Sequence, residues 1–288
     1  MNFSFGKGIK EPSIYYQSIS LFDILDALPN GSDLIKQYGV SPIGPETSRT
    51  YDGGVDQQFW NGRARATLTY FHNEFTNGVE FVPQSALLAL GLPAASNPAV
   101  EFGAAVNSQA FRAQGAEAAL EYKIGSHLFA RGGYTYLDAV VQRSFSSESL
   151  PSYNPSFPTI PIGAFSPLIG ARPFRRAPHS GYFGLSYNRS KWYGSFTGTL
   201  VGRRDDSDFL TDSNFGNSLL LPNRNLDGAY QRLELGGGYQ VTRSLTAYTD
   251  MQNLLSEHYS EAFGFPALPF TVRAGIKVSF GGESWRLK

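Results

Sequence analysis

The sequence contains no cysteine. Disulfide bonds, thiolate metal sites and cysteine nucleophiles are therefore excluded. No segment reaches the roughly 18 to 20 apolar residues that a transmembrane helix requires. Charged residues make up only 17% of the chain, and 24 basic side chains balance 24 acidic ones. A formal net charge of zero gives no general basic surface for nucleic acid or for anionic lipid headgroups.

No secretory leader is visible, because Met1 is followed by polar residues and glycine rather than by a basic segment and an apolar core. Taken alone, these absences are typical of a soluble protein. The rest of the composition indicates something else. The chain has 31 glycines and 17 prolines, which argues against a helical bundle, and 14% of its residues are aromatic.

Hydrophobic and polar residues alternate with a period of two along much of the chain, which is the pattern of β-strands with two different faces. In segment 270–280, Val272 and Ile276 belong to one face, whereas Arg273 and Lys277 belong to the other. The pattern predicts ten strands, most of them 11 to 14 residues long, at 2–9, 48–60, 63–75, 112–124, 127–140, 179–189, 191–203, 229–241, 244–254 and 270–280. Soluble strands average about 5 to 6 residues, whereas tilted strands that cross a bilayer need about 9 to 11.

Short and long connections alternate between these strands. The short ones include Asn61-Gly62, for which we predict a type I′ turn with positive φ at both central residues. The long ones, at 10–47, 76–111, 141–178, 204–228 and 255–269, are rich in Pro, Gly, Ser and Asn. Short turns on one side and long loops on the other are typical of outer-membrane barrels. The sequence therefore predicts an all-β fold, an antiparallel transmembrane β-barrel with about ten strands.

The alternation divides the side chains of such a barrel between its lumen and the surrounding lipid. Charged strand residues are expected to face the lumen: Arg63, Arg65, Glu117, Glu121, Arg131, Arg232, Glu234, Arg273 and Lys277. Apolar residues are expected to face lipid, with the aromatic ones in two interfacial girdles: Phe59, Tyr70, Tyr122, Tyr187, Trp192, Tyr239, Phe270, Val272, Ile276, Val278 and Phe280. The wider aromatic rows include Phe129 and Tyr182. The plainer explanation of these rows is that Tyr and Phe favour strands in general.

Residues capable of chemistry are scattered. His72, His127, His179 and His258 fall on separate elements, and no metalloprotease, nucleophile-elbow or dinucleotide-binding spacing occurs. We therefore expect neither an enzyme nor a cofactor. Carboxylates at Asp205, Asp206 and Asp208 could offer oxygen ligands to Ca²⁺. They lack the glycine and the distal glutamate of an EF-hand, so a polar loop without metal is the simpler interpretation.

Five segments carry a family resemblance, in chain order. They are Phe5-Gly6-Lys7-Gly8, the series Pro45-Glu46, Ser48, Tyr51 and Gly54-Val55, then Gly115-Ala116-Glu117, then Asn253-Leu254 with Tyr259, and the strand that ends at Phe280. Together they resemble the C-terminal part of TonB-dependent outer-membrane receptors, the family of siderophore and cobalamin transporters.

The resemblance implies a barrel of 22 strands, a plug domain, a TonB box and a signal peptide. Residues 1–288 contain no counterpart of the last three, so we expect a partial barrel that forms the C-terminal part of a larger one. Residues 281–288 follow Phe280 as a tail, whereas the family usually ends at its terminal Phe.

The function that the resemblance implies is nutrient uptake across the outer membrane of a Gram-negative type of cell. Its implied partners are outer-membrane lipid, the barrel-assembly machinery and a small-molecule nutrient, with TonB reached only through the plug. Two alternatives stay open. One is a small ten-stranded barrel acting as a passive pore or adhesin, and the other is a soluble β-sandwich binding module, in which the apolar faces would point inward.

Overall fold

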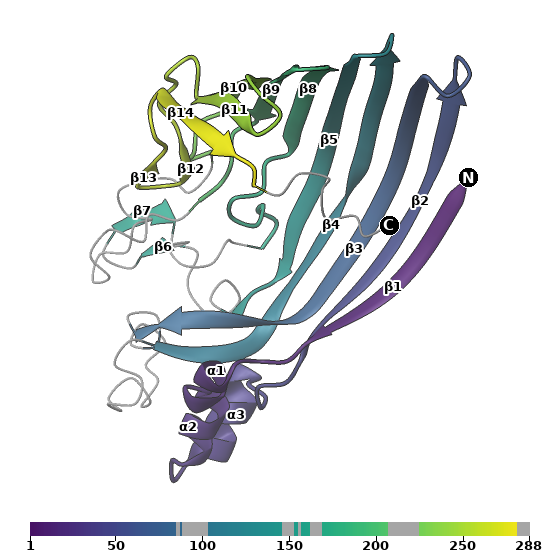
Figure 1. Ribbon diagram of the computed structural model, residues 1–288. Helices are drawn as coiled ribbons and strands as arrows, with labels where there is room; N and C mark the ends of the chain where they lie inside the picture. The colour runs from purple at the N-terminus through teal and green to yellow at the C-terminus, as the bar shows by residue number, and fades with distance from the viewer. Residues whose placement is uncertain are drawn as a thin grey trace, which may run out of the picture.

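The computed structural model describes residues 1–84, 87, 103–145, 153–154, 157–161, 169–206 and 225–280. Ten strands form one curved antiparallel sheet, in which each strand pairs with its neighbours along the chain (Figure 1). They are β1 (Asn2–Lys10), β2 (Glu46–Phe59), β3 (Ala64–Pro83), β4 (Gly103–Ile124), β5 (Leu128–Arg143), β8 (His179–Arg189), β9 (Trp192–Val201), β10 (Tyr230–Gln240), β11 (Leu245–Gln252) and β14 (Thr271–Val278). The predicted all-β, ten-stranded antiparallel architecture is confirmed.

The sheet is open in the described part of the chain, with β1 at one edge and β14 at the other. A closed ten-stranded barrel would require a ladder between these two strands, and a β-sandwich would require two large sheets. The structure therefore has the form of a barrel wall. None of the described helices is long and apolar enough to span a bilayer.

The turn between β2 and β3 is longer than predicted. Trp60, Asn61 and Gly62 all have positive φ, at 52°, 55° and 77°. The Gly62 N–H donates to the Phe59 carbonyl at 3.1 Å, and the Arg63 N–H donates to the Trp60 carbonyl at 3.2 Å. Two overlapping left-handed turns thus replace the single turn expected at Asn61-Gly62. Trp60 leaves the ladder, and its ring lies 5.5 Å from that of Tyr122.

Strands β3 and β4 extend well beyond their predicted limits at 75 and 112. The register shifts between Phe75 and Gly78, and Asn77 has a φ of 56°. The Asn77-Gly78 pair is therefore a β-bulge rather than the start of a loop, since a bulge uses one left-handed residue and then restores the ladder. The extra length carries the two strands past their neighbours at the end of the sheet where the long connections lie, which we call the loop end (Figure 1).

Three short helices occupy the connection between β1 and β2, for which the sequence predicted no helix. They are α1 (Ile14–Ser18), α2 (Leu21–Asp26) and α3 (Gly31–Tyr38). Ser13 and Ser20 cap the first two, accepting the backbone N–H groups of Tyr16 and Asp23 at 3.3 and 3.4 Å. Leu21 and Leu25 of α2 are fully buried. Their partners come from the extended strands and the adjoining connections, and the core comprises Leu21, Ile24, Leu25, Val40, Val82, Leu87, Ala104, Val106 and Phe145. We call this unit the helical lobe.

Two small hairpins complete the loop end. One pairs β6 (Tyr153–Asn154) with β7 (Phe157–Pro161), and the other pairs β12 (Ser260–Ala262) with β13 (Phe265–Pro266). Both lie within connections that were predicted as long loops.

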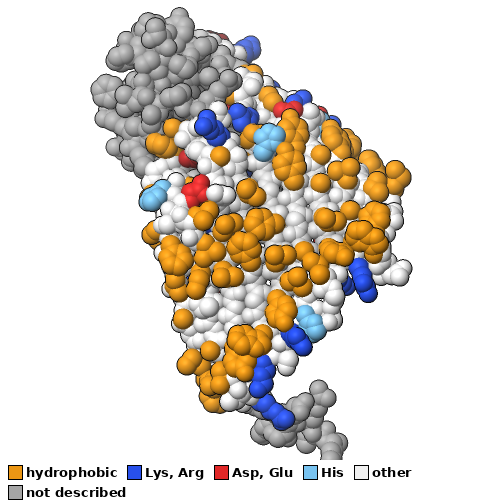
Figure 2. Space-filling view, turned by 90° about the horizontal axis from the view of Figure 1, so that it is seen from above, with side chains coloured by type: hydrophobic (Ala, Val, Ile, Leu, Met, Phe, Trp, Pro, Cys, Tyr) orange, Lys and Arg blue, Asp and Glu red, His pale blue; other side chains and the backbone are white. Residues whose placement is uncertain are grey.

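The register gives the large sheet two different faces, because paired residues in an antiparallel ladder share a face. Arg65 is paired with Glu121, and Glu121 with Arg131, so these charges lie side by side on what we call the polar face. The opposite, apolar face leaves large side chains exposed, including Leu68 at 57%, Leu120 at 54% and Ile276 at 67%. Figure 2 shows how hydrophobic side chains gather in bands over the strands, with few charged ones among them.

Tyrosine rings cover glycines on the neighbouring strand of the polar face. The paired residues are Tyr182 and Gly133, Tyr193 and Gly238, and Tyr248 and Gly275. A Cβ added at Gly238 would lie 2.5 Å from the Tyr193 ring. The absence of a side chain at each glycine therefore gives the ring its place against the sheet.

We expect Gly238→Ala to lower the free energy of unfolding by about 1 to 3 kcal/mol, as overpacking usually does. Denaturant unfolding of the protein at its full natural length, in lipid vesicles, measures this loss. Gly6→Ala is the matched control, because nothing lies within 4 Å of a Cβ at Gly6. Adding Tyr193→Ala to Gly238→Ala should recover part of the loss, and the absence of any recovery would contradict a clash with the ring.

Candidate functional site

A cavity opens at the loop end of the polar face, between the large sheet and the hairpin formed by β12 and β13. Its volume is about 380 Å³, which falls within the usual range for small-molecule sites. The sheet contributes the ends of β10, β11 and β14, and the hairpin with its following residues contributes the rest. The lining residues are Arg232, Glu234, Gln252, Asn253, Tyr259, Glu261, Ala262, Phe265, Pro266, Ala267, Leu268, Pro269 and Thr271.

The cavity combines ionic groups with exposed apolar ones. Arg232 Nε lies 3.1 Å from Glu234 Oε1, and Arg232 Nη1 lies 3.5 Å from Glu261 Oε1. Phe265 and Leu268 are 57% and 68% exposed. A few polar groups placed among apolar surfaces are typical of sites that orient a small molecule.

Asn253 fixes the connection that carries the hairpin. Its side-chain amide donates to the carbonyls of Glu257 and Leu268, both at 3.0 Å, and its Oδ1 accepts the Glu257 N–H at 3.0 Å. The residue is buried and has a φ of 49°, a left-handed conformation that asparagine tolerates better than most residues. These contacts explain the Asn253-Leu254 element of the sequence resemblance: the amide draws the two ends of the connection together.

Asn253→Ala should destabilise this connection by about 1 to 3 kcal/mol, because it leaves two carbonyls and one N–H, all partly buried, without their partner. Amide hydrogen exchange of residues 257–268 measures the effect as faster local opening. Asn253→Asp is the informative comparison, since it keeps the acceptor for the Glu257 N–H and loses both donors. Equal exchange in the alanine variant and the wild type would show that the amide does not hold the connection.

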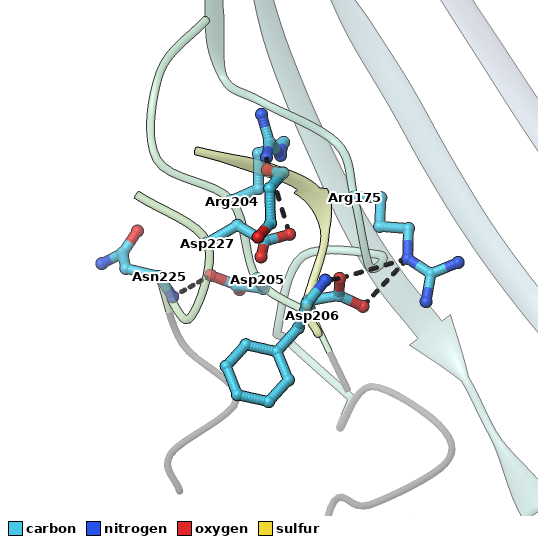
Figure 3. Close-up of polar contacts among 8 residues, drawn as sticks. Arg175, Arg204, Asp205, Asp206, Asn225 and Asp227 are labelled. Carbon is cyan, nitrogen blue, oxygen red and sulfur yellow. Dashed lines mark hydrogen bonds and ion pairs between the residues drawn. The ribbon is translucent and has the colours of Figure 1, made fainter. Parts of the chain in front are cut away.

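A buried ionic cluster lies beside the cavity and joins three connections between strands (Figure 3). Arg204, Asp205 and Asp206 follow β9, Asp227 precedes β10, and all four are at most 4% exposed. The remaining members are Arg172 and Arg175, which precede β8, and the backbone of Ser260 and Phe263 at the hairpin. We call this group the ionic cluster.

Each aspartate of the ionic cluster has a different set of partners. Arg175 Nε reaches both carboxylate oxygens of Asp206, at 3.0 and 3.2 Å, and the Phe263 N–H donates to Asp206 at 2.8 Å. Asp205 accepts the Asn225 N–H at 2.8 Å. Burial, the strongest cause, and a hydrogen bond with Asp206 raise the pKa of Asp227 to about 6, while Arg204 opposes the rise.

The ionic cluster contains Asp205 and Asp206, two of the three carboxylates considered for Ca²⁺. Their oxygens face guanidinium groups and backbone N–H donors, which is the environment of a structural ion cluster. Among the described residues, no group of three or more His, Asp and Glu side chains is arranged to hold a metal. Asp208 lies outside the described residues.

The charged residues predicted to face a lumen share the polar face wherever they belong to its ladders. Arg65 also binds Asp56, Glu234 accepts the Thr197 hydroxyl at 3.3 Å, and Arg273 is paired with Asp250. Arg63 lies in the turn before β3. The others hold ladder positions on the same face: Glu117, Glu121, Arg131, Arg232 and Lys277. That this face lines a lumen stays a prediction.

The predicted girdle residues within the strands share the apolar face. Trp192 is paired with Tyr239, and their ring centroids lie 4.4 Å apart. The same face carries Phe59, Tyr70, Tyr122, Tyr187, Val272, Ile276 and Val278. Phe270 and Phe280 lie just outside β14. Phe129 and Tyr182 were assigned wrongly, since their partners Lys123 and Gly133 place them on the polar face.

The four histidines do not meet in one site. His72 Nδ1 lies 3.1 Å from Gln114 Oε1, and His179 Nδ1 lies 2.6 Å from the Tyr134 hydroxyl. His127 contacts Ser126 next to a short turn, and His258 lies in the connection after β11. The sequence named Arg232 and Glu234 as lumen-facing, and Asp205 and Asp206 as possible Ca²⁺ ligands, but it predicted neither the cavity nor the ionic cluster as a unit. The members of the ionic cluster come from connections far apart in the chain, so no local spacing could have revealed it.

A single curved sheet of long antiparallel strands, with one polar and one exposed apolar face, defines the wall of a membrane β-barrel. Comparison with known proteins gives the family. The family model described as "TonB dependent receptor-like, beta-barrel" matches residues 2–254. The chain belongs to this family, which is a family of outer-membrane receptors and not a class of enzymes.

Solved structures share the fold of the chain. The chain is similar to the pyoverdine outer membrane receptor FpvA from Pseudomonas aeruginosa PAO1, with 15% identity and a TM-score of 0.59, over 96% of this chain and 33% of that one. It is similar to the copper transporter OprC, with 16% identity and a TM-score of 0.58, over 96% and 37% of the two chains. It is similar to the FrpB iron transporter from Neisseria meningitidis, with 16% identity and a TM-score of 0.57, over 96% of this chain and 37% of that one. The chain spans about a third of the length of these proteins, and a search of the curated proteins finds no match.

Proposed function

We propose that the chain forms part of the barrel wall and the extracellular loops of an outer-membrane transporter for a scarce nutrient. The observation that carries the proposal is the cavity at the loop end of the polar face, in a sheet whose other face is apolar and exposed. In this orientation the apolar face contacts lipid and the polar face lines the lumen. The long connections then lie outside the cell, where a nutrient is met first.

The open sheet supports a role within a larger barrel. The described residues form a ten-stranded sheet with unpaired edges at β1 and β14, and bilayer lipid does not satisfy such edges. We propose that further strands complete the wall, and that a plug outside residues 1–288 couples uptake to TonB. The nutrient is of the siderophore, cobalamin or metal type; among the similar structures, FpvA is a pyoverdine receptor and OprC a copper transporter. Barrel-assembly machinery would insert the wall.

Uptake by cells that carry the protein at its full natural length, and lack their own receptors, tests the proposal. The probes are ferripyoverdine, a ferric catecholate and Cu²⁺. We expect one of them to accumulate only when TonB is present, and a deletion of residues 260–266 to abolish accumulation because it removes one wall of the cavity. Uptake that persists without TonB would instead identify a passive pore.

A further inference from the structure

The side chains of Arg204 and Asp227 in the ionic cluster lie close together but form no hydrogen bond with each other. Arg204 Nη2 donates to the Ser260 carbonyl at 2.6 Å but lies 3.6 Å from Asp227 Oδ2, which is beyond hydrogen-bond length. In the described part of the chain, Asp227 Oδ2 and Arg204 Nε are both buried without a hydrogen-bond partner. An ionised carboxylate in this position is therefore desolvated and poorly compensated.

The surroundings of Asp227 also favour its neutral form. Asp206, which is fully buried, contributes to the raised pKa of Asp227, because two ionised carboxylates close together repel each other. Arg175 and Phe263 already bind Asp206, and Arg172 lies 3.7 Å from Asp205. A proton shared between the two carboxyl groups would convert this repulsion into a hydrogen bond.

The ionic cluster is connected mechanically to the cavity. The hairpin is bound at Ser260 by Arg204 and at Phe263 by Asp206, and its residues Glu261, Ala262 and Phe265 line the cavity. The guanidinium of Arg204 lies 5.2 Å from the Tyr230 ring, which stacks on Tyr259 with a centroid distance of 4.0 Å. A change in the cluster is thus transmitted to the hairpin through direct contacts.

We propose that the ionic cluster is a proton-dependent clasp, which holds the hairpin over the cavity most tightly when Asp227 is protonated and loosens as that proton leaves. The charged and titratable groups around Asp227 are Arg204, Asp205 and Asp206 after β9, Arg172 and Arg175 before β8, Tyr230 of β10, and Tyr259 and Glu261 of the hairpin connection. The clasp concerns the conformation of the hairpin, so it holds or fails independently of which nutrient is bound.

The pH dependence of hairpin closure is set by the difference in the pKa of Asp227 between the closed and the opened form. The pKa of Asp227 is about 6 in the folded cluster and ordinarily 3.8, so the closed form binds the proton more tightly. Closure is therefore favoured as pH falls through about 6, and the gain is complete below about 4. Between pH 7 and pH 5 the equilibrium for local opening should fall roughly tenfold.

Amide hydrogen exchange of the protein at its full natural length, in lipid vesicles, tests the clasp at the Phe263 N–H, which donates to Asp206. Rates are divided by the intrinsic exchange rate at each pH. We expect roughly tenfold greater protection at pH 5 than at pH 7, with no such step at the amides of β10. Asp227→Asn imitates the protonated side chain, so in this variant the Phe263 N–H should be as protected at pH 7 as it is in the wild type at pH 5.

Asp205→Asn is the matched control, because it removes a neighbouring buried charge and leaves Asp227 in place. It should retain the pH step. Equal protection of Phe263 at pH 5 and pH 7 in the wild type would overturn the proposal, whether or not any variant folds. A step that persists unchanged in Asp227→Asn would assign the effect to another group and would overturn it as well.

Discussion

Arg204→Ala is expected to lower the stability of the loop end by about 3 kcal/mol, which is near the lower limit for breaking a buried ion pair. Arg204 is only 4% exposed, and its loss leaves the Ser260 carbonyl and Asp227 without their buried cation. The cost stays near the lower limit because Asp227 can take up a proton and avoid an uncompensated charge.

Native-state hydrogen exchange provides the measurement for Arg204→Ala. The Asp227 N–H, which donates to the Arg204 carbonyl at 3.1 Å, is a local reporter because the substitution keeps the backbone pair. Arg65→Ala is the control: the Arg65–Asp56 pair is exposed, with side-chain exposures of 51% and 35%, and such pairs contribute about 0 to 1 kcal/mol. Similar losses in the two variants would mean that burial does not set the value of these ion pairs.

Leu235→Arg is expected to cost about 2 to 4 kcal/mol if the apolar face contacts lipid. Leu235 lies midway along β10, is paired with Phe196 and Met251, and is 43% exposed in the isolated sheet. An arginine placed there would be surrounded by hydrocarbon near the middle of the bilayer. In water, the same substitution at an exposed position would cost little.

Thr197→Arg is the matched control for Leu235→Arg. Thr197 lies at the same level of the neighbouring strand but on the polar face, paired with Glu234, which can receive the new charge. Denaturant unfolding from lipid vesicles should show a loss for Leu235→Arg and little change for Thr197→Arg. Equal losses would contradict the assignment of the two faces.

Much of the fold could be predicted because apolar and polar residues alternate along the strands with a period of two. A strand such as β14 alternates Val272 and Ile276 with Arg273 and Lys277, and only the opposed faces of a sheet give both sets a suitable environment. For Phe129 and Tyr182 the same rule gives the correct face, and the girdle assignment was wrong. Their aromatic character was weighed above their place in the alternation, which points to the polar face.

The sequence was less informative where backbone geometry departs from the ideal strand. Asn77-Gly78 gives the signal of a turn, and the bulge uses the same left-handed residue without reversing the chain. The helices α1 to α3 have only 5 to 8 residues. Helix α2 buries Leu21 and Leu25 in the core, against which Leu34 of α3 packs, and such tertiary packing supplies most of the stability of short helices. The ionic cluster could not be predicted from local sequence patterns, because partners such as Asp206 and Arg175 are 31 residues apart.

The helical lobe and the apolar face of the sheet require different surroundings. Leu21, Leu25 and Val82 are shielded by protein, so this lobe behaves like the interior of a water-soluble domain. Leu120 and Ile276 have no such cover, and in the proposed orientation they contact hydrocarbon. A detergent chosen to replace lipid around the strands can therefore dissolve the lobe, so purification conditions should be screened for retention of the lobe as well as of the sheet.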